Sequence, residues 1–173
     1  MARPAPGMLV IGIDPGTART GYGIVRQVEN GSLVAVDFGV IETSPELTLP
    51  NRLLEISDRL GVLLAEHRPD GGAVERLFLR EHVNTALSVG QASGVALLAL
   101  AKAGIPIKEY SPLEVKQAIC GYGRAEKRQV QDMVKAVLGL SERPRPDDAA
   151  DALAVAICHV HSMPIGGRLE AEQ

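Results

Sequence analysis

Residues 8–16, M-L-V-I-G-I-D-P-G, decide how the chain begins to fold. The apolar run has the length of a buried strand, and the strand predicted over residues 8–14 ends at Asp14, immediately before a Pro-Gly turn. Two more strands are predicted over residues 21–28 and 33–42. The Asn30-Gly31 pair between them is typical of a type I′ hairpin turn. The chain therefore starts with three strands, the last two joined as a hairpin.

Helices and single strands follow the hairpin. Leucine and isoleucine recur at three- and four-residue spacings over residues 50–67, as in an amphipathic helix. Ser111-Pro112-Leu113-Glu114 is a capping box with proline at the first helical position. The other predicted elements are a strand over residues 73–78, a helix over 83–103, a strand over 105–110, and helices from Ser111, from about Ala125 and over 148–161. This order predicts an α/β domain, a mixed sheet with helices on its faces.

The length and composition are those of one globular domain. With 173 residues the chain can enclose a single core, so we expect one domain over residues 1–173 with flexible termini at 1–7 and 164–173. No segment has the ~18 consecutive apolar residues of a membrane span, and no secretory leader is evident. The two cysteines, Cys120 and Cys158, form no disulfide framework. These features predict a cytoplasmic protein without membrane contact.

The charge is distributed unevenly along the chain. A formal net charge of -3 argues against nucleic-acid binding, because phosphate binders are usually basic. Residues 76–145, however, hold 11 Lys+Arg against 6 Asp+Glu, so the acidic excess lies in the rest of the chain. This distribution permits a basic surface beside an acidic one, although separation in sequence does not by itself place charges on one surface.

Four acidic residues stand where the pattern predicts core. Asp14 ends an apolar strand, Glu75 lies within another, and Asp148 and Asp151 are one helical turn apart near the start of an apolar helix. Charges in such places are costly unless they are paired or bind a metal. Carboxylates are the ligands that Mg²⁺ prefers. Two such ions ~4 Å apart would activate a water for attack on a phosphodiester. The acids therefore predict a metal-dependent phosphodiesterase site.

Each of these acids also has a structural interpretation. Asp14 could cap the Pro-Gly turn, and Glu75 could pair with a nearby arginine as a half-exposed strand residue. Asp147, next to Asp148, is interpreted as the N-cap of the last helix, where aspartate suits the helix dipole. The sequence leaves open which of these two neighbours would bind a metal.

Four ordered motifs resemble those of RuvC-type crossover junction endonucleases. The similarity runs from about Met8 to Met163, and the segments S-P-L-E-V-K-Q and G-Y-G-R-A-E-K-R-Q-V-Q also resemble that family. The motifs are G-I-D-P-G-T-A-R-T-G-Y-G at residues 12–23, A-V-E-R-L-F at 73–78, N-T-A-L-S-V-G-Q-A-S-G-V at 84–95 and D-A-A-D-A-L-A-V-A at 148–156.

The resemblance implies an RNase H-like fold with a five-stranded mixed sheet. It implies a homodimer that resolves four-way (Holliday) DNA junctions by paired symmetric nicks, in recombination and DNA repair, with RuvA and RuvB as partners. The family's catalytic, metal-binding carboxylates fall on Asp14, Glu75, Asp148 and Asp151. The expected cofactor is Mg²⁺, two ions per subunit, with Mn²⁺ as a substitute.

The resemblance also implies DNA contacts. Two lysines that the family uses near the DNA backbone fall on Lys116 and Lys127, and an aromatic residue that stacks on a junction base falls on Phe78. Without the family, a phenylalanine at a strand end belongs as readily to the core.

An independent argument for a DNA contact comes from the helix expected near Ala125. Arg124, Lys127 and Arg128 crowd its N-terminus, where the helix dipole disfavours cations, so we predict that a DNA phosphate binds there. The alternative is an ordinary solvated charged face. His82 is close enough in sequence to reach the site, but no argument gives it a role.

Three other functions compete with this interpretation. D-P-G-T after a strand also resembles the phosphate loop of actin-like and sugar kinases, although those proteins need two such domains. The YqgF group of RNase H-like proteins shares the D-x-G pattern. A junction-binding protein without catalysis is the third, but a phosphate binder has no use for four acids.

Overall fold

The computed structural model describes residues 7–76 and 83–163, which form a mixed sheet of five strands. The strand order is β3-β2-β1-β4-β5. The five strands and the mixed sheet agree with the prediction. β1, β2 and β3 are antiparallel, whereas β4 and β5 run parallel to β1. The strands are β1 (Leu9–Asp14), β2 (Arg19–Gln27), β3 (Leu33–Glu42), β4 (Gly71–Glu75) and β5 (Ile107–Tyr110).

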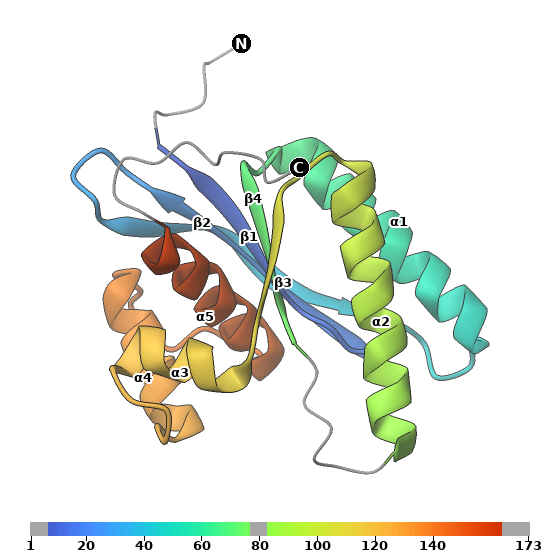
Figure 1. Ribbon diagram of the computed structural model, residues 1–173. Coiled ribbons are helices and arrows are strands. Elements are labelled where there is room, and N and C mark those ends of the chain that lie inside the picture. The colour runs from blue at the N-terminus through green and yellow to red at the C-terminus, as the bar shows by residue number, and fades with distance from the viewer. Residues whose placement is uncertain (1–6, 77–82, 164–173) are drawn as a thin grey trace.

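Five helices cover the two faces of this sheet (Figure 1). α1 and α2 lie on one face, and α3, α4 and α5 lie on the other. The central strand β1 is buried on both faces, with Ile11 in one core and Val10 in the other, which explains why it is almost continuously apolar. The helices are α1 (Leu49–His67), α2 (Val83–Lys102), α3 (Pro112–Cys120), α4 (Lys127–Val137) and α5 (Asp147–Ser162).

The capping box of α3 is confirmed. The Ser111 hydroxyl oxygen accepts a hydrogen bond from the Glu114 backbone N–H (3.2 Å), and the Glu114 carboxylate accepts one from the Ser111 backbone N–H (2.7 Å). Two donors at the helix start are thereby satisfied. This cap sets the start of α3 directly after β5.

The turn between β2 and β3 differs from its prediction. The hairpin is present, but Gly31 has a positive φ (82°) and Asn30 does not, so the turn is not type I′. The Gly31 N–H donates to the Val28 carbonyl (2.8 Å), and the Asn30 side chain accepts from the Ser32 N–H (2.9 Å). This is the longer loop in which a type I turn precedes a left-handed glycine.

Close packing of α5 on the sheet depends on glycines in β1 and β2. A Cβ atom at Gly12 would lie 2.1 Å from the Ala152 carbonyl oxygen, and one at Gly21 would lie 2.0 Å from the Asp148 carbonyl oxygen. No larger residue fits there without moving the helix. The glycines therefore bring the N-terminal half of α5 against the end of β1.

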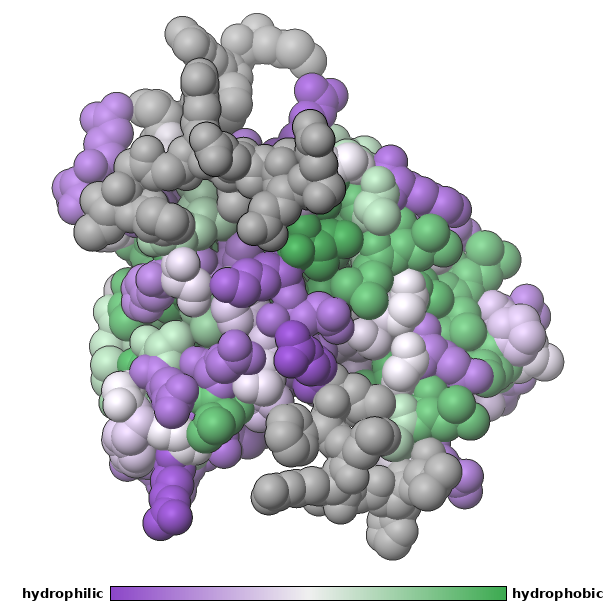
Figure 2. Space-filling view, in the orientation of Figure 1, coloured by the Kyte–Doolittle hydropathy of each residue, from purple (hydrophilic) through white to green (hydrophobic). Residues whose placement is uncertain are grey.

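Helix α2 is the most apolar helix in the described chain. Its stretch Asn84–Lys102 reaches the length and hydropathy of a membrane span, contrary to the expectation from the sequence. Ala92, Ala96 and Leu100 nevertheless fill the core against the sheet, as in a core helix. Figure 2 shows apolar side chains at the surface over the part of the molecule that contains α1 and α2. On α2, Leu87 and Leu98 are 62% and 52% exposed.

Candidate active site

Two of the predicted carboxylates lie side by side where parallel strands end. Ile13 of β1 pairs with Val74 of β4, so the next residues, Asp14 and Glu75, are neighbours at the carboxyl ends of these strands. In open α/β sheets this edge is where ligands usually bind. The sheet alone therefore brings together two acids that are 61 positions apart in the sequence.

Burial and mutual repulsion raise the pKa values of three carboxyl groups. Burial, and then the charge of Glu75, raise the pKa of Asp14 to about 9. Burial also raises the pKa of Glu75 and that of Asp151, although Lys127 opposes the shift of both. The charge of Asp151 also raises the pKa of both Asp14 and Glu75, so the three acids belong to one electrostatic cluster. Such a cluster favours either bound protons or a cation.

Helix α5 supplies the other two acids. Asp148 and Asp151 are one turn apart on it, and the contact of the Asp148 backbone with Gly21 holds this turn against the strand that pairs with β1. The predicted N-cap is wrong: Pro146 takes that position, and Asp147 is the first residue of the helix. Asp147 instead accepts hydrogen bonds from α4, from Lys127 (3.2 Å) and Gln131 (3.0 Å). A proline at the cap position leaves the aspartate free to pair with a cation.

Two basic side chains form ion pairs with the carboxylates of α5. Lys127 Nζ lies 3.4 Å from Asp151 Oδ2, and Arg19 Nε lies 3.1 Å from Asp148 Oδ2. Burial opposes protonation of Lys127, but the carboxylates of Asp151 and Asp147 outweigh it and raise the pKa of this lysine. The acids are therefore partly neutralised by the protein itself.

Four predicted site residues line one pocket of about 210 Å³: Glu75, Asp151, Lys116 and Lys127. We call it the carboxylate pocket. Its remaining walls come from α3, α4 and α5, and they are apolar. Asp148 lies outside it, on a second pocket. The structure thus brings Asp14, Glu75 and Asp151 together, with two lysines beside them, and turns Asp148 toward Arg19.

The donor set fits a hard divalent cation, because all four acids offer oxygen and none is replaced by sulfur or nitrogen. As the side chains stand, no three His, Cys, Asp or Glu residues among those described converge closely enough to hold one ion. In this structure the α5 carboxylates are instead paired with Arg19 and Lys127. A bound cation would replace these partners.

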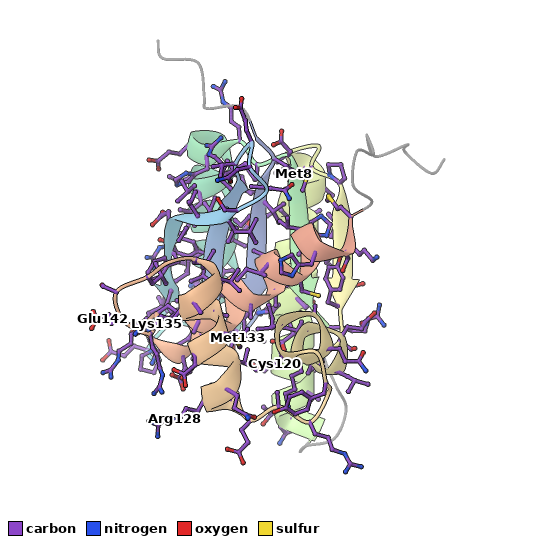
Figure 3. The ribbon with its side chains drawn as sticks, turned by 90° about the vertical axis from the view of Figure 1, so that its left-hand side faces the viewer. Met8, Cys120, Arg128, Met133, Lys135 and Glu142 are labelled. Carbon is purple, nitrogen blue, oxygen red and sulfur yellow. The ribbon has the colours of Figure 1, made fainter. Side chains whose placement is uncertain are left out.

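Two other predicted DNA contacts, Arg124 and Arg128, lie outside the carboxylate pocket. α4 begins at Lys127, two residues later than expected, so Lys127 and Arg128 form its first turn and Arg124 precedes it. Arg124 and Arg128 are exposed, and Figure 3 shows Arg128 projecting outward at the end of the molecule opposite Met8. Phe78 and His82 fall outside the described residues.

Three arginines near Asp148 are not among the predicted site residues: Arg19, Arg143 and Arg145. Arg19 is within the first motif and could have been noticed as a charge at the start of a strand. Arg143 and Arg145 follow α4 in a proline-rich turn, where the sequence pattern does not indicate which way a side chain points.

Residues 10–159 match the family model for crossover junction endodeoxyribonuclease RuvC. The chain belongs to this family. A RuvC from Chloroflexus aurantiacus is 57% identical over 157 residues, which cover 91% of this chain and 95% of that protein. A RuvC from Syntrophomonas wolfei is 54% identical over 164 residues, covering 95% of each chain. The kinase and YqgF alternatives are thereby excluded.

Solved structures agree with the family. Thermus thermophilus RuvC in complex with a Holliday junction substrate has a TM-score of 0.84 at 40% identity, covering 89% of this chain and 93% of that one. The yeast mitochondrial Holliday junction resolvase Ydc2 has a TM-score of 0.64 at 17% identity, covering 92% of this chain and 82% of that one, which shows a shared fold. RuvC-family nucleases are metal-dependent.

Proposed function

We propose that this protein nicks four-way DNA junctions symmetrically, with Asp14, Glu75, Asp148 and Asp151 as its catalytic carboxylates. The observation that carries the proposal is the carboxylate pocket: half-buried acids with raised pKa values open on a pocket that Lys116 and Lys127 also line. A binding protein would gain nothing from acids beside a phosphate, whereas a metal-dependent hydrolase needs them.

The four carboxylates would hold Mg²⁺, two ions per subunit, with Mn²⁺ able to replace it. When bound, these ions supply a Lewis acid and an activated water at the phosphodiester. Asp148 is the ligand from the start of α5 in this proposal, because Asp147 is already bound by Lys127 and Gln131.

The chain's own cations would orient the DNA. Lys116 and Lys127 line the carboxylate pocket with Glu75 and Asp151, so they are placed to bind the oxygens of a phosphate that enters it. Lys127 would exchange its carboxylate partners for that phosphate when the metal arrives. The exposed Arg124 and Arg128 would bind the backbone further out, and Phe78 would stack on a junction base.

A homodimer would match the two-fold symmetry of the substrate. The outer side of α2 exposes Leu87 and Leu98, and a second copy of the chain is the partner we propose for it. Such exposed apolar groups on a core helix are typical of an interface. RuvA and RuvB are the further partners proposed, in the cytoplasm.

One incubation tests this function. The purified protein is given a mobile synthetic junction or a linear duplex of the same sequence, with and without Mg²⁺, and the products are resolved on a denaturing gel. Paired nicks at symmetric positions, in the junction and with Mg²⁺, are expected. Asp14→Asn should bind the junction and leave it intact. Cleavage by Asp14→Asn, or equal cleavage of the duplex, would refute the proposal.

A further inference from the structure

A second pocket adjoins the carboxylate pocket, and of its lining residues only Asp148 and Lys127 have a part in the function proposed above. It has a volume of about 570 Å³, and Arg19, Arg143, Arg145 and Asp148 are among the residues that line it. We call it the arginine pocket. Lys127 lines both pockets, so they meet at this side chain.

The two acids of the arginine pocket already have partners. Asp147 pairs with Lys127 (3.2 Å), and Asp148 pairs with Arg19 (3.1 Å). Arg143 makes a two-point ion pair with Asp132, in which its NH2 group donates to Oδ2 at 2.9 Å. Neither acid therefore leaves an uncompensated negative charge in the pocket.

Arg145 is the unused cation. It is exposed, and within the described residues it forms no ion pair or hydrogen bond, although its charge lowers the pKa of Asp147. The buried Pro144 and the adjacent Pro146 flank it and limit the freedom of its backbone. A solvated arginine is common on any surface, but this one faces a hollow that borders the carboxylates.

The lining also indicates what kind of ligand fits. None of the residues that line the arginine pocket is aromatic or a large aliphatic, so it offers no surface on which a base would stack. Its free group is a guanidinium, whose planar fork matches the oxygens of a phosphate. A DNA strand carries one phosphate for each ~3.4 Å of its rise, so two adjoining pockets that each contain basic side chains suit phosphates of one strand.

We propose that the arginine pocket binds a backbone phosphate of the cleaved strand, next to the phosphodiester held at the carboxylate pocket, and that Arg145 is its principal ligand. The inference rests on the proposed nuclease function and extends it to a residue outside the predicted site. Arg19 would then have two tasks, since it pairs with Asp148 and borders the same phosphate.

Junction affinity as a function of salt tests the charge. The Kd is measured without metal, for the wild type, Arg145→Gln, Arg145→Lys and the control Arg68→Gln. Arg68 is exposed and follows α1, whose end lies near Leu9, at the opposite end of β1 from Asp14. Arg145→Gln should raise the Kd roughly threefold to tenfold and lower the salt slope by about 1. Arg145→Lys should restore the slope, and Arg68→Gln should change neither.

Neutral methylphosphonates, placed one at a time along the cleaved strand, test the contact itself. One position beside the nick should weaken wild-type binding, and the same substitution should have no further effect on Arg145→Gln, as in a double-mutant cycle. If the losses simply add at every position, or if Arg145→Gln matches Arg68→Gln, the inference is wrong. A wild type that neither binds nor cuts the junction would refute the nuclease proposal instead.

Discussion

Lys127 Nζ lies 3.4 Å from Oδ2 of Asp151, so a lysine of α4 occupies a carboxylate that the proposed metal would need. The same amine also reaches Asp147. In the proposed function, lysine and metal would therefore compete for Asp151, and the lysine would become available to DNA when the metal is bound. This exchange would couple loading of the metal to binding of the substrate.

Replacing Lys127 with alanine should affect metal and DNA in opposite directions. Without the ammonium group, Asp151 loses its partner, so a divalent cation binds more tightly and the rise in Tm at a fixed Mg²⁺ concentration becomes larger than in the wild type. Junction affinity should fall, with a salt slope smaller by about 1. Thermal unfolding with and without Mg²⁺ and binding at several salt concentrations measure the two effects.

Lys135→Ala on the same helix is the matched control, because Lys135 lies in the last turn of α4, away from the carboxylates. It should leave both measurements unchanged. A smaller Mg²⁺-dependent rise in Tm for Lys127→Ala would contradict the competition.

The stability of the metal-free protein should depend on Asp14. Because burial and Glu75 raise its pKa from 3.8 to about 9, the folded state holds a proton that the unfolded state has already lost at neutral pH. This contribution to stability is complete below the unfolded pKa and is lost as pH rises toward about 9. We expect the free energy of unfolding, measured in EDTA, to fall as the pH rises from about 7 to about 9.

The pH range of this measurement matters because a second group, the buried His159, changes the stability in the opposite direction with pH. Burial lowers the pKa of His159 to about 4, so its contribution is lost as pH falls below 6.5. Above about pH 7, which exceeds the usual pKa of histidine, His159 is neutral in both the folded and the unfolded state. It then no longer contributes to the pH dependence of stability. Asp14→Asn should flatten the profile in this window and stabilise the metal-free protein at pH 9. An unchanged slope would show that Asp14 does not carry the proton.

Regular elements were predictable because they depend on local patterns. Apolar spacing, together with the capping box for α3, predicted each helix and strand, with ends displaced by about two residues or fewer except in β4. The strand predicted over residues 73–78 is observed as Gly71–Glu75. The hairpin turn was predicted wrongly because an Asn-Gly pair also suits a three-residue loop that ends in a left-handed glycine, and here the Asn30 side chain bonds to Ser32 within that loop. The N-cap of α5 was wrong for a similar reason, since Asp147 pairs with the distant Lys127.

The candidate site was predictable in its acids and in Lys116 and Lys127, but not in Arg19. Asp14 and Glu75 stand out as charges in apolar strands, and this pattern can be recognised from the sequence alone. The pairing of Arg19 with Asp148 joins the start of β2 to the start of α5, and no spacing rule predicts such a contact. The tight packing of α5 on Gly12 was likewise hidden, because a glycine's neighbours across the core depend on the whole fold.

Adding a methyl group at Gly21 should damage both the fold and the site. Its Cβ would lie 2.0 Å from the carbonyl oxygen of Asp148, a backbone atom that moves only with the helix. We expect Gly21→Ala to cost about 3 kcal/mol in urea unfolding, at the upper end for an overpacked core. Because α5 shifts away from β1, the Mg²⁺-dependent rise in Tm should also shrink.

Gly61→Ala provides the comparison for this substitution. Gly61 lies in α1 with nothing within 4 Å of the added Cβ atom, so alanine should be neutral or stabilise by up to ~1 kcal/mol. Equal effects of the two substitutions would mean that the contact between Gly21 and α5 is not a close one.

A charge on the outer side of α2 should separate assembly from folding. Leu98 is 52% exposed, so Leu98→Glu removes little from the core of the subunit and should leave urea unfolding of the monomer within about 0.5 kcal/mol. In a two-fold interface the substitution places two carboxylates near each other in apolar surroundings, and dimerisation should be lost. Sedimentation velocity reports the mass, and the junction assay reports the nicks. A monomer with an intact carboxylate pocket should nick one strand of the junction without the paired second nick. A Leu98→Glu variant that remains dimeric would show that the interface lies elsewhere.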